Sequence, residues 1–234
     1  MKPLQQQPNL TDQVYQAILD GICSGDLAPG THLVQEQIAE RLGVSRQPVQ
    51  QAMALLKSNG IVREQRGRGL AIAPLDLEAM RQRYDIRASL DELAARRAAE
   101  QAAASPKLAA RIRREGNAII EAGRAAVENG DLPDMVAHDV SFHEFIYEMC
   151  GNSLIGTTAE LHWHYLRRVM AEVLRYALPG PAIWQQHEDI LEAILDGDAE
   201  SAGTRAREHV LNAANRLAGA FIAHRQETGR SLAS

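Results

Sequence analysis

Four side chains in the second half of the chain have the types and spacing of a transition-metal site. Two of them, Asp139 and His143, lie four residues apart in the segment DVSFH. On a helix this spacing places both side chains on one face, about one turn apart, where a carboxylate and an imidazole can share one cation. The pair alone is weak evidence, so the prediction of a site depends on further ligands.

Two more histidines flank the Gly197-Asp198 turn almost symmetrically. His187 lies 10 positions before Gly197, and His209 lies 11 positions after Asp198. If the flanking helices pack antiparallel, a rise of ~1.5 Å per residue places both histidines ~15–17 Å from the turn and level with each other. The two imidazoles can then face a common point.

One carboxylate and three imidazoles suit Zn, Ni, Mn or Fe, and they leave coordination positions open for water or for the oxygens of a ligand. These ligand types do not choose among the four metals. The alternative is that each histidine is an ordinary buried or surface residue. We expect structural roles for the other five histidines, which lack a partner at ligand spacing: His32, His138, His162, His164 and His224.

Long helical patterns must position these side chains. From Asp76 onward the sequence contains no convincing run with a period of two, and short breakers separate the helical patterns. Six helices fit between the breakers, so we expect residues 75–234 to form an all-α bundle. Such a bundle could also be only a dimerisation scaffold. The breakers are Ser105-Pro106, Asn129-Gly130-Asp131, Gly151-Asn152, Pro179-Gly180-Pro181 and Gly197-Asp198.

Composition agrees with a mostly α protein. Of the 234 residues, 45% are apolar, 24% are charged and only 4% are aromatic, which favours helices over extensive sheet. No apolar run approaches the ~18 residues that span a bilayer, and the first residues lack the apolar core of a signal peptide. The two cysteines, Cys23 and Cys150, have no partner at metal-ligand spacing. We therefore expect a cytoplasmic protein without a disulfide framework and without a membrane partner.

Charge is distributed unevenly along the chain. The net charge is −5, but residues 1–74 hold seven basic and six acidic groups, so the acidity belongs to the rest of the chain. Between Lys57 and Arg68 there are four cations against the single carboxylate of Glu64. This local excess is typical of segments that contact phosphates, although a solvated surface loop would have the same composition.

The first 74 residues predict a helix-turn-helix. Apolar residues from Thr11 to Ser24 recur with a period near four, and a second helix is closed by Gly43 at a position that needs a left-handed residue. We expect Ile38, Ala39 and Leu42 to face inward on this second helix. Two short helices joined by the tight GVS turn form the arrangement whose second helix enters the major groove of DNA.

The second helix of that motif has a polar outer face. Ser45 can cap it, Pro48 falls in its first turn, and Val49, Met53 and Leu56 form its inner stripe. The outer face then carries Arg46, Gln47, Gln50 and Gln51. After Gly60 the runs IVREQ and LAIAP read as two short strands around a Gly/Arg turn, which would make a wing.

The whole module resembles the GntR family of bacterial regulators. The segments PGTHL, ERLGVSRQPVQQAMALLKSNGIV and GRG agree with the family in order, spacing and turn residues. The resemblance implies a winged helix-turn-helix over residues 1–74 that binds double-stranded operator DNA. It further implies that Arg46 contacts bases and that Gly67, Arg68 and Gly69 form the wing tip that reaches the minor groove.

One position departs from the family pattern. Where members commonly have Val-Arg-Glu-Ala, this chain has Val49-Gln50-Gln51-Ala52, so Gln replaces a frequent guanine-reading Arg. Gln pairs best with adenine N6 and N7, which predicts an operator different from the usual guanine-containing half-site. The alternative is that Gln50 contacts only phosphate or water.

The second domain resembles the FCD-type ligand-binding domain of the FadR branch of this family. The segments that carry the resemblance are D-x-x-F-H followed by EMCGN, then HEDILEAILDGDAESA, then a histidine. In many members of that branch the matching Asp and three His hold a metal, which implies Asp139, His143, His187 and His209 here. The six expected helices resemble the VanR-like subgroup.

Several polar residues of this domain are candidates to bind a small carboxylate effector. Arg87 matches an arginine common in the first helix of the domain, and Asn212 lies one turn beyond His209. Arg167 and Arg168 follow the LHWHYL stretch. An arginine can bind a carboxylate through two hydrogen bonds, although arginines on helices more often form solvated salt bridges.

These features predict a ligand-responsive transcriptional regulator, a repressor that acts as a homodimer on a pseudo-palindromic operator. Effector binding would then lower operator affinity through linkage. A regulator for which the metal itself is the signal is the alternative within regulation. We do not expect an enzyme, since Glu144 points away from the Asp139/His143 face and no other general base is evident. A DNA-packaging role is disfavoured because the chain is acidic overall.

Overall fold

The computed structural model describes residues 10–65, 69–177 and 182–231. The chain divides into two compact units, one that ends at Leu75 and one that begins at Asp76. This division lies one residue beyond the boundary expected from the sequence. Each unit has its own core.

The first unit contains three helices within its described residues: α1 (Leu10–Ser24), α2 (Gln35–Leu42) and α3 (Arg46–Ser58). Helix α1 packs against α3, and α2 also packs against α3. The apolar stripe of α1 (Val14, Ile18, Ile22) and that of α3 (Val49, Met53, Leu56) are both buried, as expected from their period. Gly43 ends α2 in the left-handed conformation, with φ 66°.

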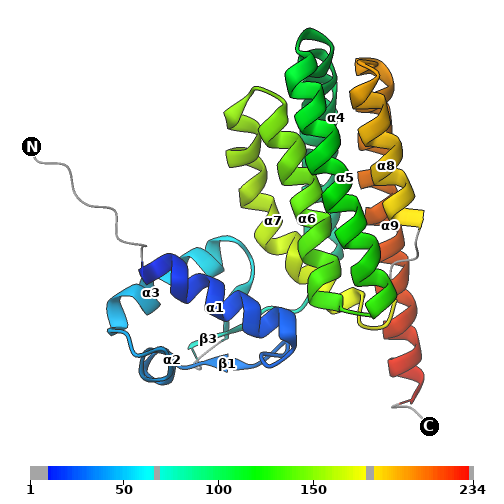
Figure 1. Ribbon diagram of the computed structural model, residues 1–234. Coiled ribbons are helices and arrows are strands. Elements are labelled where there is room, and N and C mark those ends of the chain that lie inside the picture. The colour runs from blue at the N-terminus through cyan, green and yellow to red at the C-terminus, as the bar shows by residue number, and fades with distance from the viewer. Residues whose placement is uncertain (1–9, 66–68, 178–181, 232–234) are drawn as a thin grey trace, which may run out of the picture. The chain divides into compact units, whose positions relative to one another are not determined.

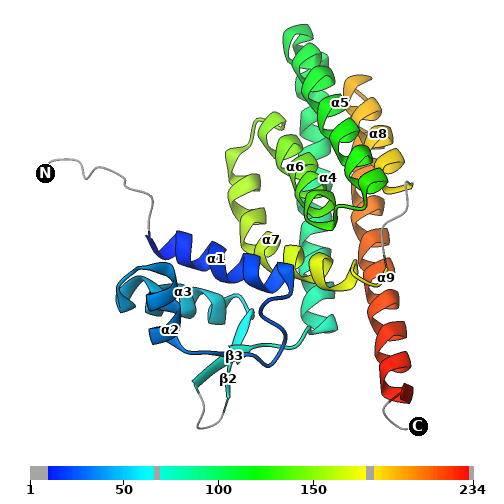
Figure 2. The same ribbon diagram turned by 60° about the horizontal axis from the view of Figure 1, so that its bottom comes forward.

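Three short antiparallel strands complete this unit: β1 (His32–Leu33), β2 (Val62–Gln65) and β3 (Gly69–Ile72). Figure 2 shows β2 and β3 side by side, and the pairing runs from Val62 opposite Ile72 to Gln65 opposite Gly69. This hairpin is the predicted wing. Strand β1, which the sequence analysis missed, pairs with β3 on its other edge, so the order is β1-β3-β2.

Two local expectations for the first unit were wrong. Leu42 was expected to face inward, but its side chain is 38% exposed because it lies in the last turn of α2 and only Ala39 of that helix is buried. Ser45 stands at the N-cap position of α3 with extended backbone, but its side chain makes no capping hydrogen bond. The start of α3 is therefore left with backbone N–H groups that are available to another acceptor.

The second unit is helical throughout its described residues (76–177 and 182–231), as Figure 1 shows. Four of the five predicted breakers separate consecutive helices, and the fifth, Pro179-Gly180-Pro181, lies outside the described residues. The described part thus contains the six helices expected. They are α4 (Leu77–Ala104), α5 (Pro106–Asn129), α6 (Leu132–Met149), α7 (Ser153–Val173), α8 (Ala182–Leu195) and α9 (Ala199–Ser231).

Side chains at the breakers explain where these helices begin and end. The carboxylate of Asp76 accepts hydrogen bonds from two backbone N–H groups at the start of α4, and Ser105, Asp131 and Asn152 cap α5, α6 and α7 in the same way. Gly130 ends α5 in the left-handed conformation, with φ 69°. Local chemistry therefore fixes most of the helix boundaries.

Small residues let α4 lie close to α9 along the centre of the bundle. The most extensive packing in the unit is between these two helices. On α4 the buried face is formed largely of alanines: Ala88, Ala94, Ala95, Ala98, Ala99 and Ala102. Within the described residues, none of the helices combines the length and the hydropathy that crossing a membrane requires.

Candidate metal centre and nucleic-acid interface

The four predicted metal ligands meet inside the second unit. Asp139 and His143 come from α6, His187 comes from α8 and His209 from α9. One ligand atom of each lies within 4.8 Å of the others. The three histidines are buried and Asp139 is half-buried. The donor set therefore converges on one point that is largely shielded from solvent.

The antiparallel packing of α8 and α9 brings two imidazole nitrogens face to face. Nε2 of His187 lies 3.1 Å from Nε2 of His209 and 3.6 Å from Oδ1 of Asp139. The ring of Phe142 stacks on His187 with centroids 4.2 Å apart, and Trp184 contacts the same imidazole edge-on at 4.8 Å. These aromatic rings hold His187 in place from two sides.

A buried carboxylate that sequence reasoning missed orients His143. Nδ1 of His143 donates to Oδ1 of Asp91 on α4 at 2.9 Å, and the Tyr147 hydroxyl donates to the same oxygen at 2.9 Å. The Nδ1–H bond leaves Nε2 of His143 with its lone pair. Within the described part of the chain this buried nitrogen has no hydrogen-bond partner. A carboxylate behind a histidine is the usual outer partner of a metal-bound imidazole.

His209 is oriented in the same way by an amide. Its Nδ1 donates to Oε1 of Gln186 on α8 at 2.9 Å, so Nε2 of His209 carries the lone pair that faces the cluster. Gln186 was not among the predicted site residues, although it immediately precedes His187. Its position one residue before a predicted ligand was the only sequence signal.

Electrostatics keep two of the imidazoles neutral. Burial lowers the pKa of His187 and of His209 well below the usual value, and the neighbouring imidazoles of the cluster, followed by Arg87 and Arg216, lower both further. A neutral imidazole is the form that binds metal ions. The pKa values therefore favour metal ligation at neutral pH.

Asp91 also joins the cluster to Arg87. Nε of Arg87 donates to Oδ2 of Asp91 at 3.1 Å, and both side chains are buried. Burial raises the pKa of the Asp91 carboxyl, but its interactions with His143 and Arg87 and the hydrogen bond from Tyr147 together lower the pKa overall. The i,i+4 spacing of Arg87 and Asp91 in YDIRASLDEL was the signal that could have identified this carboxylate.

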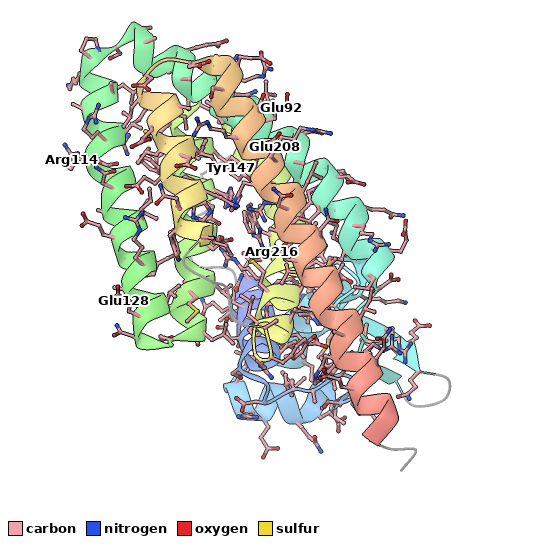
Figure 3. The ribbon with its side chains drawn as sticks, turned by 90° about the vertical axis from the view of Figure 1, so that its right-hand side faces the viewer. Glu92, Arg114, Glu128, Tyr147, Glu208 and Arg216 are labelled. Atoms are coloured by element: carbon pink, nitrogen blue, oxygen red, sulfur yellow. The ribbon has the colours of Figure 1, made fainter. Side chains whose placement is uncertain are left out.

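A cavity of about 220 Å³ adjoins the cluster, and Asp139 and His209 form part of its wall. Among the four predicted effector residues, Arg87 lines this cavity. The others do not belong to its lining: Arg167 pairs with Glu144 at 3.0 Å, Arg168 is buried 3.9 Å from Glu172, and Asn212 is exposed. Arg216 on α9, which the sequence analysis did not select, is a second arginine of the cavity wall. Figure 3 labels Arg216, which belongs to α9, and Tyr147, which lies among the helices of the bundle.

The first unit presents a polar face along the first turns of α3. Ser45, Arg46, Gln47 and Gln50 are exposed. Arg46 forms an ion pair with Glu36 in which both side chains remain largely exposed. Gln51 is different, because its Oε1 accepts a hydrogen bond from the Thr11 hydroxyl of α1 at 2.7 Å. This bond connects the amide of Gln51 to α1, while the Gln51 side chain remains exposed like the other four.

A shallow groove runs from Gln50 to the wing. It is lined in part by Lys57 of α3 and by Glu64 and Leu70 of the two wing strands, and Lys57 pairs with Glu64. Of the predicted wing-tip residues, Gly67 and Arg68 lie outside the described residues. Gly69 begins β3 with φ 77°, a conformation that favours glycine.

Comparison with known families identifies both units. Residues 10–72 match the model described as "Bacterial regulatory proteins, gntR family", and residues 82–212 match the FCD domain. The chain belongs to the GntR family of regulators with an FCD domain. The second unit is hereafter the FCD unit.

Known regulators match most of the chain. The chain is 27% identical over 203 residues to the HTH-type transcriptional regulator YdfH of Escherichia coli, a match that covers 87% of this chain and 86% of the relative. It is 26% identical over 201 residues to the HTH-type transcriptional repressor RspR of Escherichia coli, with 86% of each covered. The structure of E. coli McbR/YncC has the same fold, with a TM-score of 0.75 at 21% identity over 92% of this chain and 100% of that one.

These matches establish the general function. The GntR/FCD chain is a DNA-binding transcriptional regulator and not an enzyme, because the family models and the relatives described above are those of regulators.

Proposed function

We propose that the FCD unit holds one divalent transition metal, Zn, Ni, Mn or Fe, on Asp139, His143, His187 and His209, and that a small carboxylate bound beside it changes the affinity of the regulator for its operator. The observation that carries this proposal is the convergence of the four ligand atoms within 4.8 Å. The six helices of the unit also support placing the chain in the VanR-like subgroup.

The donor set fits a metal ion for a second, independent reason. Nε2 of His143 is buried and has no hydrogen-bond partner among the described residues. Leaving a polar atom in that state costs about 1–3 kcal/mol. A cation bound at the centre of the cluster would satisfy this nitrogen, and Asp91 already holds its tautomer in the form that accepts one.

A metal bound there would supply positive charge and open coordination positions to the oxygens of a carboxylate. The protein itself supplies the rest of the recognition. Arg87 and Arg216 line the cavity, and the buried Tyr84 hydroxyl is a further donor on its wall. These three groups would orient an anionic ligand beside the metal ligands Asp139 and His209, which share the cavity wall.

At the other unit, we propose that α3 enters the major groove with Ser45, Arg46, Gln47 and Gln50 toward the DNA and with the wing residues Gly67, Arg68 and Gly69 toward the minor groove. The exposure of the first turn of α3 supports this orientation. Gln51 would contribute through its bond to α1 rather than by reaching a base. We propose a homodimer on a pseudo-palindromic site and repression as the mode of action, the latter supported by the relative named as a repressor.

In this proposal, thermodynamic linkage couples ligand binding in the FCD unit to DNA binding by the first unit. If the carboxylate binds better in the arrangement that disfavours DNA contact, effector binding lowers operator affinity by the factor by which DNA lowers effector affinity. The test begins with selection of preferred fragments from genomic DNA at about 150 mM salt, where nonspecific phosphate contacts are screened. The affinity for the selected site is then measured with metal-loaded protein, with chelated protein, and with added carboxylates.

The outcomes of this titration separate the alternatives. A short palindrome whose affinity falls only when a carboxylate is added to the metal-loaded protein supports the proposal. A switch produced by metal alone would instead make the metal the signal. Failure to enrich any site from the genome would contradict the operator assignment.

A further inference from the structure

The cavity beside the metal cluster has polar groups on one part of its wall and an apolar surface on the rest. Its polar members are Tyr84, Arg87, Asp139, His209 and Arg216. The remaining lining residues are all apolar: Met135, Val136, Met170, Val173, Leu174, Ala177, Ile183, Trp184, Ala213, Leu217 and Ala220. A ligand that fills this space must therefore bury a largely apolar surface.

Helix directions place the apolar part to one side of the cluster. On α9, Ala213, Leu217 and Ala220 follow His209 at helical spacing and share its face. At ~1.5 Å per residue, Ala220 lies ~16 Å further along α9 than His209.

The other helices extend in the same direction. Helix α8 runs antiparallel to α9, so Ile183, which precedes His187, lies beside the later turns of α9. On α6, Met135 and Val136 precede Asp139 by one turn. The apolar residues of the lining thus lead away from the metal ligands.

The groups at the cluster end suit one carboxylate. Arg87 lines the same cavity as Asp139 and His209, and the Tyr84 hydroxyl is buried without a hydrogen-bond partner among the described residues. Burial raises the pKa of Tyr84 to about 12, so this hydroxyl remains a donor at neutral pH. A cation, a guanidinium and a hydroxyl donor next to one another match the two oxygens of a single carboxylate.

Volume limits the size of the ligand. A cavity of ~150 Å³ lined by apolar side chains is known to hold one benzene molecule. The cavity here measures about 220 Å³, which leaves room for a ring and a carboxylate, or for an unbranched chain of about six carbons.

We propose that the effector of this regulator is a monocarboxylate with an apolar body, either an aromatic acid or a short-chain to medium-chain aliphatic acid, whose carboxylate faces Arg87, Tyr84 and the metal ligands and whose body lies against Ala213, Leu217 and Val173. This inference rests on the proposed function and specifies its ligand. Polar acids with a second carboxylate or several hydroxyls should bind more weakly, because Arg216 is exposed and the rest of the wall beyond the cluster is apolar, which would leave those groups short of hydrogen-bond partners.

Isothermal titration calorimetry of the full-length, zinc-loaded protein tests the proposal. The probes are acetate, butanoate, hexanoate and phenylacetate, with succinate and malate as polar acids of similar size. We expect affinity to rise about threefold to fourfold per added methylene up to hexanoate. Phenylacetate and hexanoate should bind with a negative heat-capacity change, which reports burial of apolar surface, and should bind at least about tenfold more tightly than succinate.

Two variants locate the apolar body. Ala213 is half-buried in the cavity wall one turn beyond His209, whereas Ala223, further along the same helix, is exposed. Ala213→Leu should weaken hexanoate about tenfold and acetate much less, since acetate does not extend a full turn along α9. Ala223→Leu should bind every probe as the parent protein does. Because acetate binding and circular dichroism both report the folded state, loss of hexanoate binding alone cannot come from unfolding.

Each contrary outcome has a distinct meaning. Tighter binding of succinate or malate than of hexanoate overturns the monocarboxylate assignment while the proposed ligand-responsive function stands. If both Ala→Leu substitutions reduce the affinity for hexanoate equally, the placement of the apolar body in this cavity is wrong. Absence of binding by all six acids overturns this inference together with the carboxylate part of the proposed function.

Discussion

Asp91 on α4 and His143 on α6 are 52 residues apart in the chain and are joined by a hydrogen bond of 2.9 Å. Both side chains are buried, and the second carboxylate oxygen of Asp91 accepts from Arg87. Arg87 lines the cavity beside the cluster, so one carboxylate contacts both a cavity residue and a candidate metal ligand. A ligand that moves Arg87 would therefore change the support of His143.

Replacing that carboxylate should weaken metal binding. Asp91→Asn removes the negative charge opposite Arg87 and replaces one of the two carboxylate oxygens by an NH2 donor, so the side chain can no longer accept from Arg87 on one oxygen and from His143 on the other. Loss of such an outer partner typically lowers metal affinity about 10-fold to 100-fold, and an uncompensated buried guanidinium costs about 3–5 kcal/mol of stability. Competition with a chromophoric chelator measures the first effect and urea denaturation the second.

The matched control for this substitution lies on the same helix. Asp85 is exposed on α4, so Asp85→Asn should leave metal affinity and stability within error of the parent values. If Asp91→Asn retains the metal affinity of the parent protein, Asp91 does not orient His143 for metal binding.

Removing one imidazole should empty the metal site. His187 offers Nε2 to the cluster, so His187→Ala should reduce bound metal from one ion per chain to a small fraction of that value. It should also blunt the response of DNA binding to carboxylates. Elemental analysis of dialysed protein measures the metal. His138 lies on α6 but outside the cluster, so His138→Ala should keep the full metal content. Full metal occupancy in His187→Ala would show that His187 is not a metal ligand.

Chelation should lower thermal stability. A metal present at about 100 times its Kd stabilises the folded state by about 2.7 kcal/mol. For a chain of this size we expect its removal to lower Tm by about 5–10 °C. Scanning calorimetry before chelation, after chelation and after reloading measures the shift. A Tm that does not change in the parent protein, or that changes equally in His187→Ala, would contradict metal binding at this cluster.

A glycine on a neighbouring helix should be required for the shape of the site. A Cβ at Gly123 of α5 would overlap the Trp184 ring, and Trp184 contacts His187 and lines the cavity. Gly123→Ala should therefore displace Trp184, cost about 1–3 kcal/mol of stability and weaken both metal and carboxylate binding. Tryptophan fluorescence and metal competition measure these effects.

Another helical glycine provides the comparison for Gly123. Gly219 of α9 has open space where a Cβ would be added. Gly219→Ala should stabilise the helix by about 0.5–1 kcal/mol without changing metal affinity. Equal metal affinity in the two alanine variants would show that Trp184 does not determine the geometry of the site.

The first exposed turn of α3 should carry operator recognition. Arg46→Ala should weaken specific DNA binding by about 1–3 kcal/mol, the usual value of one good base contact, and should leave metal content unchanged. Fluorescence anisotropy with the selected operator and with a scrambled duplex separates specific from nonspecific loss. Arg114→Ala, an exposed arginine on α5 (Figure 3), should bind operator normally. Unchanged operator affinity in Arg46→Ala would contradict the assignment of α3 as the recognition helix.

The sequence by itself predicted the helices of both units and the four side chains that meet in the candidate metal cluster. Turns and caps depend on residues within a few positions of one another, so Gly43, Ser105 and Gly130 could be assigned without tertiary contacts. Helical period places Asp139 and His143 on one face, and the resemblance to the FCD domain implied that this pair belongs to a metal site. His187 and His209 follow from helical rise on either side of one turn.

Only the tertiary structure decided which other side chains surround those ligands. Asp91 orients His143 because α4 packs beside α6, and Arg216 rather than Asn212 lines the cavity because of how α9 is rotated against its neighbours. Burial of Asp91 with Arg87, the bond from Thr11 to Gln51 and the apolar wall of the cavity likewise depend on helices that meet from distant parts of the chain. Helical period places a residue on a face, but interhelical packing determines what that face meets.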